Sequence, residues 1–510
     1  MWSKRIFPIL FISTVLLILV VCLYYFQMKQ NFHIDELYTY GLSNSYFEPF
    51  PFDKNQWLSG DYYQNYLSPT LETRFSYDSV YYNQTQDVHP PLYYWLIHTI
   101  ASFFPGVFSK WIGLSLNLGV HLLTFGMLFA LLKRYTQNRW IALFGAAFWA
   151  LSVGALSSAN FIRMYHLLGL LQITLLYLSL GKKFSKKTLV GVALVCFLGG
   201  LTHYYFYLYA FSLVLTTCLL LLCQNRIRDM FSYGLSALLG VVGALASFPA
   251  VFTHLTATNR GQEVMANLDD AVFSNSNPFV VFIKQELFLG IRLRYLVIAG
   301  IVLGLLVCIS LWRTKKLSPV WLLVGSFLPV VAYIMIVQQV SHYQTPRYIY
   351  SVYPAITAGL FLLVYNGFKG IFQQQKVLAF LVGMLAVGGI GWSLWTEAPD
   401  YLYAEHVTLQ SLVEAPEEQT IFVLGDAYWK VSQVVAEVKE FKSIYPSIIT
   451  NSLTNLPDEM EVDSFYVLML PHEKNNYERV MQDIAKKYGF MIESKVEIET
   501  DRILYYLVEE

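Results

Sequence analysis

Acidic side chains are concentrated in one polar segment near the amino terminus. Residues 27–90 hold eight of the fifteen acidic residues that precede Tyr401, and the next acidic residue after Asp87 is Asp229. Asp35 and Glu36 follow shortly after an apolar run at 6–26. A carboxylate near the lipid headgroups is suited to accept a proton from an acceptor hydroxyl, so this pair is the candidate catalytic base. The alternative is that the pair caps a helix in the loop.

The same segment closes with a second group of polar residues beside paired prolines, Asp87-Val88-His89-Pro90-Pro91, followed by Leu92-Tyr93-Tyr94-Trp95. Prolines suit a loop that enters a helix at its first turn, and the aromatic residues suit a membrane interface. A structural role therefore accounts for the prolines and the aromatic rings. It does not account for Asp87 and His89 together, which we take as candidate substrate-binding residues.

Three further motifs place basic residues at the predicted outward ends of apolar segments: Phe161-Ile162-Arg163-Met164-Tyr165, Thr202-His203-Tyr204-Tyr205 and Gln344-Thr345-Pro346-Arg347-Tyr348. A planar guanidinium can donate two hydrogen bonds to a phosphate. Arg347 with Tyr348 is therefore a candidate phosphate-binding motif. The alternatives are arginines that anchor to lipid headgroups and a histidine that is satisfied between helices.

The elements that must position these residues are membrane helices. The chain of 510 residues is 55% apolar and 14% charged, and it contains about eleven apolar blocks long enough for a bilayer. The predicted spans are 6–26, 109–132, 140–158, 161–180, 188–204, 206–223, 233–252, 292–311, 319–338, 348–366 and 377–396.

Positive charge predicts the orientation of these spans. With the amino terminus in the cytoplasm, every inner connection is basic, and the outer connections hold nearly all the acidic residues. The apolar segment 91–104 is too short to span, and a crossing there would reverse every later connection. We therefore expect it to form a juxtamembrane or re-entrant helix on the outer face.

The last part of the chain has a different composition. Twenty of the 35 acidic residues follow Tyr401. Strands are expected at 420–424 and 464–470, amphipathic helices at 427–441 and 475–488, and a hairpin at 490–508. The predicted domains are thus a transmembrane catalytic domain at 1–396, which includes the first outer loop 27–108, and a small extracytoplasmic α/β domain at 397–510. The five cysteines lie in or beside apolar segments, which argues against a disulfide framework.

The sequence resembles the lipid-dependent glycosyltransferases of the GT-C superfamily in three features. These are an apolar first segment, an Asp-Glu pair early in a long outer loop, and His-Pro-Pro-Leu-Tyr-Tyr at the end of that loop. The similar branch contains the bacterial relatives of protein O-mannosyltransferases and of the aminoarabinose transferase of lipid A. The resemblance implies that Asp35 is the catalytic base, accompanied by Glu36, and that the late Arg-Tyr motif contacts the donor phosphate. Many relatives also have an Arg with a nearby Tyr at the start of an outward-starting helix, which implies that Arg163 is a further phosphate-binding residue. By the same resemblance His203 and Tyr204, at another outer turn, are candidate substrate-binding residues. It also implies an inverting transfer.

The predicted function is transfer of a hexosyl or pentosyl group from a polyprenyl-phosphate donor to an acceptor hydroxyl on the extracytoplasmic side of the plasma membrane. The acceptor is a glycan, a lipid or a protein, and no nucleic-acid partner is expected. No essential cofactor is expected, although Asp35, Glu36, Asp87 and His89 could supply ligands to a divalent metal. A flippase for lipid-linked sugars is the main alternative, followed by an oligosaccharide polymerase or ligase and an inactive scaffold.

Overall fold

The structure is a computed structural model that describes residues 2–51, 53–181, 183–258, 261–263, 278–288, 290–314, 317–341, 343–369, 375–448, 455–471, 477–499 and 502–509. Contacts within the chain define two compact units. Unit 1 comprises Met1–Lys29, Asp87–Tyr93 and Gly113–Leu402, and unit 2 comprises Gln30–Gln86, Tyr94–Ile112 and Tyr403–Glu510. The domain boundaries expected from the sequence, 1–396 and 397–510, stay a prediction.

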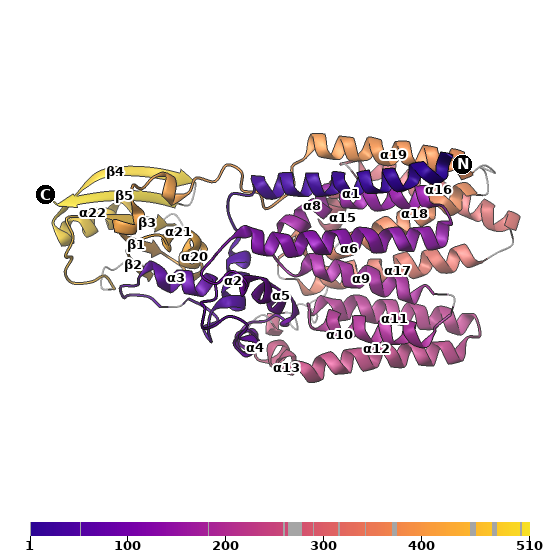
Figure 1. Ribbon diagram of the computed structural model, residues 1–510, viewed down its shortest axis with the longest axis horizontal. Coiled ribbons are helices and arrows are strands. Elements are labelled where there is room, and N and C mark those ends of the chain that lie inside the picture. The colour runs from indigo at the N-terminus through magenta and orange to yellow at the C-terminus, as the bar shows by residue number, and fades with distance from the viewer. Residues whose placement is uncertain are drawn as a thin grey trace. The chain divides into compact units, whose positions relative to one another are not determined.

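Unit 1 is a bundle of helices (Figure 1). Its helices are α1 Trp2–Met28, α6 Lys110–Thr136, α7 Arg139–Ala150, α8 Val153–Asn160, α9 Tyr165–Ser179, α10 Lys186–Gly200, α11 Tyr205–Cys223, α12 Ile227–Ser247, α13 Ala250–Thr256, α15 Pro278–Glu286, α16 Leu293–Thr314, α17 Ser318–Val340, α18 Tyr353–Lys369 and α19 Gln375–Thr396, with two short 3₁₀ helices, η1 Pro346–Tyr348 and η2 Tyr350–Val352.

Many of these helices are membrane spans by length and composition. Among the described residues, eight helices qualify: α1, α6, α11, α12, α16, α17, α18 and α19. The pair α7 and α8, which bends by 54°, makes a ninth if it counts as one span. Each of the eleven predicted apolar segments contains a helix, but the count that the structure supports is eight or nine. These helices indicate a multi-pass membrane protein.

Small residues allow close packing inside the bundle. Helices α10 and α12 run side by side, as do α11 and α17. A Cβ atom on Gly240 of α12 would lie 2.2 Å from the Ala193 carbonyl oxygen of α10. Glycine therefore sets the distance between these two helices, as small residues commonly do in membranes.

Unit 2 combines short helices from the early part of the chain with a carboxy-terminal sheet (Figure 1). Its helices are α2 Ile34–Asn44, α3 Gly60–Leu67, α4 Tyr77–Gln86, α5 Leu92–Ala101 (whose first two residues belong to unit 1), α20 Tyr428–Gln433, α21 Val435–Val438 and α22 Tyr477–Tyr488, with 3₁₀ helices η3 Leu409–Ser411 and η4 Pro416–Glu418; its strands are β1 Thr420–Gly425, β2 Ser443–Ile448, β3 Ser464–Leu470, β4 Phe490–Glu499 and β5 Arg502–Glu509.

The sheet is mixed, with strand order β2-β1-β3-β5-β4. Strand β1 is parallel to β2 and β3, whereas β5 is antiparallel to β3 and β4. The predicted strands, the final hairpin and the helix near 475–488 are confirmed within the described residues. The predicted single helix at 427–441 is two short helices, α20 and α21, and strand β2 was not predicted. Helix α5 confirms a short helix within 91–104.

The early loop and the carboxy-terminal sheet pack together inside unit 2. Leu58 forms a β-bridge with Ile444 of β2, and the Trp57 ring lies 5.1 Å from the ring of Tyr445. Ser447 donates a 2.8 Å hydrogen bond to Asn55. These contacts fix the loop residues that precede α3 against the edge of the sheet.

Candidate active site

Asp87, His89 and Arg163 form a hydrogen-bonded chain within unit 1. His89 Nδ1 lies 2.7 Å from a carboxylate oxygen of Asp87, and His89 Nε2 lies 3.3 Å from Arg163 Nη2. A neutral His89 with its proton on Nδ1 satisfies both contacts, because Nδ1–H donates to Asp87 and Nε2 accepts from Arg163. Burial by itself raises the pKa of Asp87, but His89 and Arg163 outweigh burial, and the pKa lies below its ordinary value. The charged Asp87 carboxylate thus holds His89, and His89 in turn holds the buried Arg163 guanidinium.

The backbone that presents Arg163 is held by Asn117 of α6. Arg163 lies in the non-helical stretch between α8 and α9. Asn117 donates hydrogen bonds to the carbonyls of Ala159 (3.0 Å) and Phe161 (2.9 Å). Tyr93 in turn donates to Asn117 Oδ1 at 3.0 Å. The side chain of Asn117 therefore ties the end of α8 to α6, and the Phe161 carbonyl also accepts a 2.8 Å hydrogen bond from the Arg163 amide.

His203 joins this chain from the turn between α10 and α11. Its ring lies 5.8 Å from the ring of His89, 5.3 Å from that of Tyr165 and 4.7 Å from that of Tyr205. Burial, with His89 and Arg163 nearby, lowers the pKa of His203 well below its usual range. His203 is therefore a neutral imidazole beside a cationic guanidinium.

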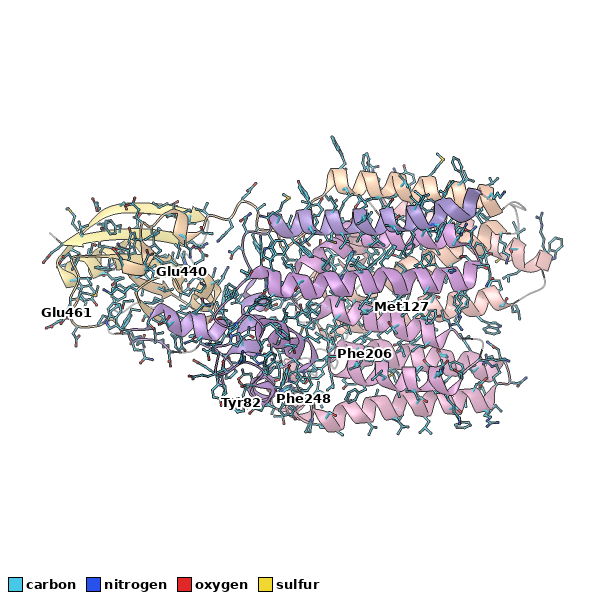
Figure 2. The ribbon with its side chains drawn as sticks, in the orientation of Figure 1. Tyr82, Met127, Phe206, Phe248, Glu440 and Glu461 are labelled. Carbon is cyan, nitrogen blue, oxygen red and sulfur yellow. The ribbon has the colours of Figure 1, made fainter. Side chains whose placement is uncertain are left out.

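This turn is tight because Gly199 allows it. A Cβ atom on Gly199 would lie 2.3 Å from the ring of Phe206, a fully buried residue of α11 (Figure 2). The Leu92 amide, at the start of α5, donates a 2.9 Å hydrogen bond to the Leu201 carbonyl. The loop-closing motif is thereby tied to the turn that carries His203.

Arg347 and Tyr348 lie in η1, between α17 and α18. The ring of Tyr348 lies 6.0 Å from that of Tyr165 and 5.6 Å from that of Tyr205, so aromatic contacts connect it to His203. The Arg347 guanidinium lies 5.3 Å from the Tyr348 ring centre. Tyr333 of α17 donates a 2.7 Å hydrogen bond to the Tyr348 carbonyl and fixes this short 3₁₀ helix.

The remaining predicted site residues lie elsewhere. Tyr204 bonds through its hydroxyl to His254 Nδ1 at 2.7 Å, on α13. Asp35 and Glu36 belong to the first turn of α2, in unit 2. The predicted meeting of Asp35 with Arg347 stays a prediction.

Glu36 has a clear local role. Its carboxylate accepts a 2.6 Å hydrogen bond from the His33 amide, and His33 Nδ1 accepts one from the Asp35 amide. This reciprocal arrangement is a capping box at the start of α2, and Glu36 is fully buried. Asp35 keeps a partly exposed side chain (21% exposed), with an oxygen 3.7 Å from His33 Nδ1. The capping alternative thus holds for Glu36, and the cap orients Asp35 on the first turn.

A second group of acidic residues was not predicted as part of the site, although Glu286 is one of the charged residues of the predicted outer loop 253–291. Glu286, at the end of α15, accepts a hydrogen bond from the Tyr353 hydroxyl. Tyr350 donates a 3.0 Å hydrogen bond to Asp400, which lies after α19. Burial, with the charges of Asp400 and Glu397, raises the pKa of Glu286 to about 8. A buried glutamate is seldom ionised without a cationic partner, so Glu286 is protonated at neutral pH.

Local sequence signals for the unpredicted residues are weak. Asn117 and Tyr333 lie inside apolar runs, where a single polar residue gives no indication of its partner. Glu286 lies in an acid-poor apolar stretch, and that position is the one signal that could have marked it. Among the described residues, no three His, Cys, Asp or Glu side chains are grouped as they would be around a metal ion.

The helices of unit 1 and the carboxy-terminal mixed sheet form a fold that also occurs in solved structures. No family model and no curated relative matches the sequence. Among the solved structures that this chain resembles are two of ArnT from Cupriavidus metallidurans. The form bound to undecaprenyl phosphate matches with a TM-score of 0.52 and 13% identity over 98% of both chains. The apo form gives the same score and identity over 99% of this chain and 98% of that one. At this identity the similarity establishes a shared fold only.

Proposed function

We propose that this protein is a membrane glycosyltransferase that moves a sugar from a polyprenyl-phosphate donor to an acceptor hydroxyl on the extracytoplasmic side. The proposal extends to eleven membrane spans, with α9, α10 and the bent pair α7 and α8 crossing the bilayer, and to a cytoplasmic amino terminus. The carboxy-terminal domain then lies outside the cell, and the acceptor belongs to a cell-envelope glycan, a glycolipid or a protein.

The arrangement of Arg163 supports this proposal most directly. Arg163 is buried and held by the His89–Asp87 chain. Arg347 lies beside the ring of Tyr348, which contacts the rings of Tyr165 and Tyr205. Two guanidinium groups at helix ends suit the phosphate of a lipid donor. The similar ArnT structure holds undecaprenyl phosphate, which agrees with a donor of that chemical class.

The reaction is a single displacement at the anomeric carbon. The acceptor oxygen forms a bond to that carbon while the bond between the carbon and the phosphate oxygen breaks, and the configuration inverts. Asp35 takes the proton from the acceptor hydroxyl as the new bond forms. Arg347 and Arg163 stabilise the negative charge that develops on the departing polyprenyl phosphate.

Asp87 and His89 act on this reaction through Arg163. The Asp87 carboxylate fixes the tautomer of His89, and His89 Nε2 accepts from the guanidinium, so the guanidinium keeps one orientation. His203 is a neutral hydrogen-bonding group next to Arg163, and Tyr204 stabilises the same turn through His254. Preorganised donors of this kind stabilise a transition state without having to reorient during the reaction.

The experiment is a transfer assay with purified full-length protein in lipid nanodiscs. Radiolabelled polyprenyl-phosphate hexoses, pentoses and aminosugars are offered with acceptor lipids and glycans from the cell envelope. We expect transfer by the wild type and a loss of about 10²- to 10³-fold in kcat for Arg347→Ala. The matched control is Arg292→Ala, because Arg292 is exposed at the start of α16.

The same assay in sealed proteoliposomes, which keep the two leaflets apart, separates the alternatives. Movement of the labelled lipid across the bilayer without sugar transfer would favour a flippase and refute the transferase. Equal losses in Arg347→Ala and Arg292→Ala would show that Arg347 has no special role. Mass spectrometry of envelope glycans from cells with and without the protein then identifies the sugar and its point of attachment.

A further inference from the structure

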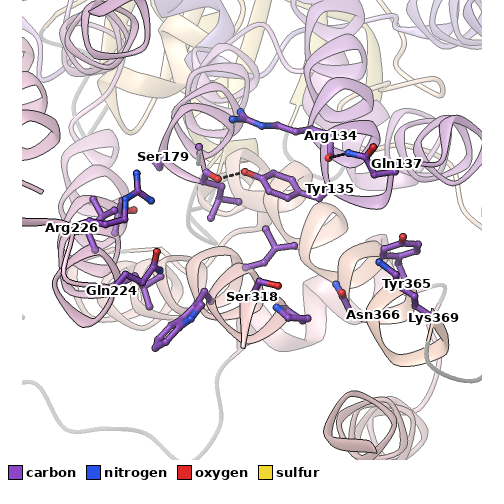
Figure 3. A pocket seen from close by; sticks show the side chains of 18 of the residues that line it. Arg134, Tyr135, Gln137, Ser179, Gln224, Arg226, Ser318, Tyr365, Asn366 and Lys369 are labelled. Carbon is purple, nitrogen blue, oxygen red and sulfur yellow. Dashed lines mark hydrogen bonds between the residues drawn. The ribbon is translucent and has the colours of Figure 1, made fainter. Parts of the chain in front are cut away.

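Unit 1 contains a cavity of about 920 Å³ that the transfer reaction does not use (Figure 3). Its lining comes from the ends of α6, α9, α11, α16 and α18, from the start of α17 and from the turn before α12. The residues that line it are Arg134, Tyr135, Gln137, Ser179, Leu180, Gly181, Thr217, Leu220, Leu221, Gln224, Arg226, Ser310, Ser318, Pro319, Trp321, Leu322, Tyr365, Asn366 and Lys369.

This cavity is remote from the Arg163 cluster. Asn117, which holds the Arg163 segment, and Arg134, which lines the cavity, are both on α6. They are 17 residues apart (134 − 117), which is about 25 Å along a helix axis. The cavity therefore lies at the opposite end of the helices, where the basic connections gather.

The lining is cationic. Arg134, Arg226 and Lys369 come from three different elements and lie on different sides of the opening in Figure 3. None of the described residues in the lining carries a carboxylate. Asp229, outside the lining, pairs with Arg226 at 2.7 Å and balances one of the three charges. An anion that enters the cavity therefore meets a net positive field.

The lining also supplies neutral donors and apolar contacts. The Gln137, Gln224 and Asn366 amides and the Ser318 hydroxyl can donate hydrogen bonds, while Leu220, Leu322 and Trp321 offer apolar surface. Cations with neutral donors suit phosphate oxygens, and aliphatic walls suit the carbon atoms attached to them. The volume exceeds what a bare phosphate needs and falls within the range of small-molecule sites, roughly 300–1,000 Å³.

We propose that this cavity binds a phosphate group, supplied by the headgroup of an anionic membrane lipid, with Arg134, Arg226 and Lys369 as its cationic ligands. Basic connections between membrane helices face the cytoplasmic leaflet, where anionic lipids are concentrated. Arg134 is held in place, because it donates a 3.2 Å hydrogen bond to the Tyr177 carbonyl and its guanidinium lies 5.0 Å from the Tyr177 ring. The site does not depend on the transferase activity proposed above.

The test compares the full-length protein in nanodiscs of pure phosphatidylcholine and of phosphatidylcholine with phosphatidylglycerol. Retained lipid is counted by native mass spectrometry, and the melting temperature is followed in parallel. Each cation near an anionic lipid contributes about fivefold to binding. We expect wild type to retain phosphatidylglycerol, Lys369→Gln to weaken binding about fivefold, and Arg134→Gln with Lys369→Gln about 25-fold.

The matched control is Lys133→Gln. Lys133 precedes Arg134 in the same basic connection, but it is exposed and does not line the cavity. Lys369 is also exposed, so its substitution tests the site without disturbing the helix core.

A third arm of the experiment separates the two sources of phosphate. In it, inorganic phosphate is titrated into the protein in the absence of phosphatidylglycerol. Inorganic phosphate alone could raise the melting temperature of the wild type but not that of Lys369→Gln. That result supports the phosphate site and assigns it to a soluble anion. Retention of phosphatidylglycerol that is lost in Lys369→Gln, but not in Lys133→Gln, supports the lipid headgroup. Equal effects of both substitutions, or no effect of either ligand on wild type, would overturn the proposal.

Discussion

Glu286→Gln tests whether a buried, protonated carboxyl beside Tyr353 makes stability depend on pH. The side chain of Glu286 is 7% exposed, and its pKa rises from 4.5 to about 8. Below pH 4.5 the carboxyl is protonated in both the folded and the unfolded protein. Between pH 4.5 and about 8 the unfolded chain loses this proton and the folded protein keeps it, so the free energy of unfolding falls as pH rises.

The size of this effect follows from the shift. A difference of 3.5 pH units (8 − 4.5) corresponds to at most about 5 kcal/mol, since each unit is worth about 1.4 kcal/mol. Stability from this group is therefore fully present below pH 4.5 and is lost as pH rises to about 8. A glutamine cannot ionise, and its amide oxygen can accept the hydrogen bond from Tyr353 that Glu286 accepts.

The assay is thermal unfolding of the purified protein in detergent between pH 5.5 and pH 9. We expect Glu286→Gln to melt close to the wild type at the acidic end and clearly above it at the alkaline end. Glu461→Gln is the control, because Glu461 is exposed on unit 2 (Figure 2). The reasoning is refuted if Glu286→Gln and wild type lose stability in parallel as the pH rises.

Three further predictions concern the proposed transferase. Asp35→Asn is expected to lower kcat by about 10²- to 10⁴-fold with an unchanged melting temperature. Its control is Asp61→Asn, which should transfer at the wild-type rate because Asp61 is an exposed residue of the same unit. Asp87→Asn removes the charge that orients the buried arginine chain, so transfer should fall roughly 10- to 100-fold and be partly restored by glutamate; wild-type kinetics would contradict this. Asn117→Leu removes two hydrogen bonds to buried backbone carbonyls and should destabilise the protein by about 1–3 kcal/mol and also lower kcat, with Leu123→Ala on the exposed face of α6 as the control.

The helices of unit 1 could be predicted because a bilayer imposes a length on apolar segments. Each predicted span contains a helix, and the errors lie at breaks within spans. The span at 140–158 is two helices, because the Ser152 side chain accepts from the Ala155 amide and caps α8. A capping serine inside an apolar run resembles any other small polar residue in a membrane helix, so the sequence does not mark this break.

Strand β2 could not be recognised because Pro446 lies in its middle. Proline cannot donate to a sheet ladder and usually argues against a strand. Here β2 is the first strand in the sheet order, and the Pro446 carbonyl accepts a 2.8 Å hydrogen bond from the Asn55 amide. The partner of this edge is a loop nearly 400 residues earlier in the chain (446 − 55 = 391), and no local pattern can indicate such a pairing.

For the site, too, the sequence predicted the residues but not the contacts between them. Asp87 and His89 were singled out because they stand together just before an apolar segment, and Arg163 and His203 because of the family resemblance. Their mutual contacts were not predicted, and neither was Asn117, because these contacts depend on which helices pack together. The role of Glu36 was only partly predicted, since either a base or a cap fits an Asp-Glu pair at the start of a helix.

A common feature explains why the polar cluster forms where it does. Arg163, His203 and Arg347 each lie between two consecutive α-helices, where some backbone carbonyls or amides have no α-helical partner. A different group closes each gap: the Asn117 side chain at the first, the Leu92 amide at the second and the Tyr333 hydroxyl at the third. In a membrane such breaks persist only where other groups satisfy the backbone. The residues that close the gaps therefore belong to the design of the site as much as the charged groups do, and substituting them should disturb phosphate binding without any direct contact to the phosphate.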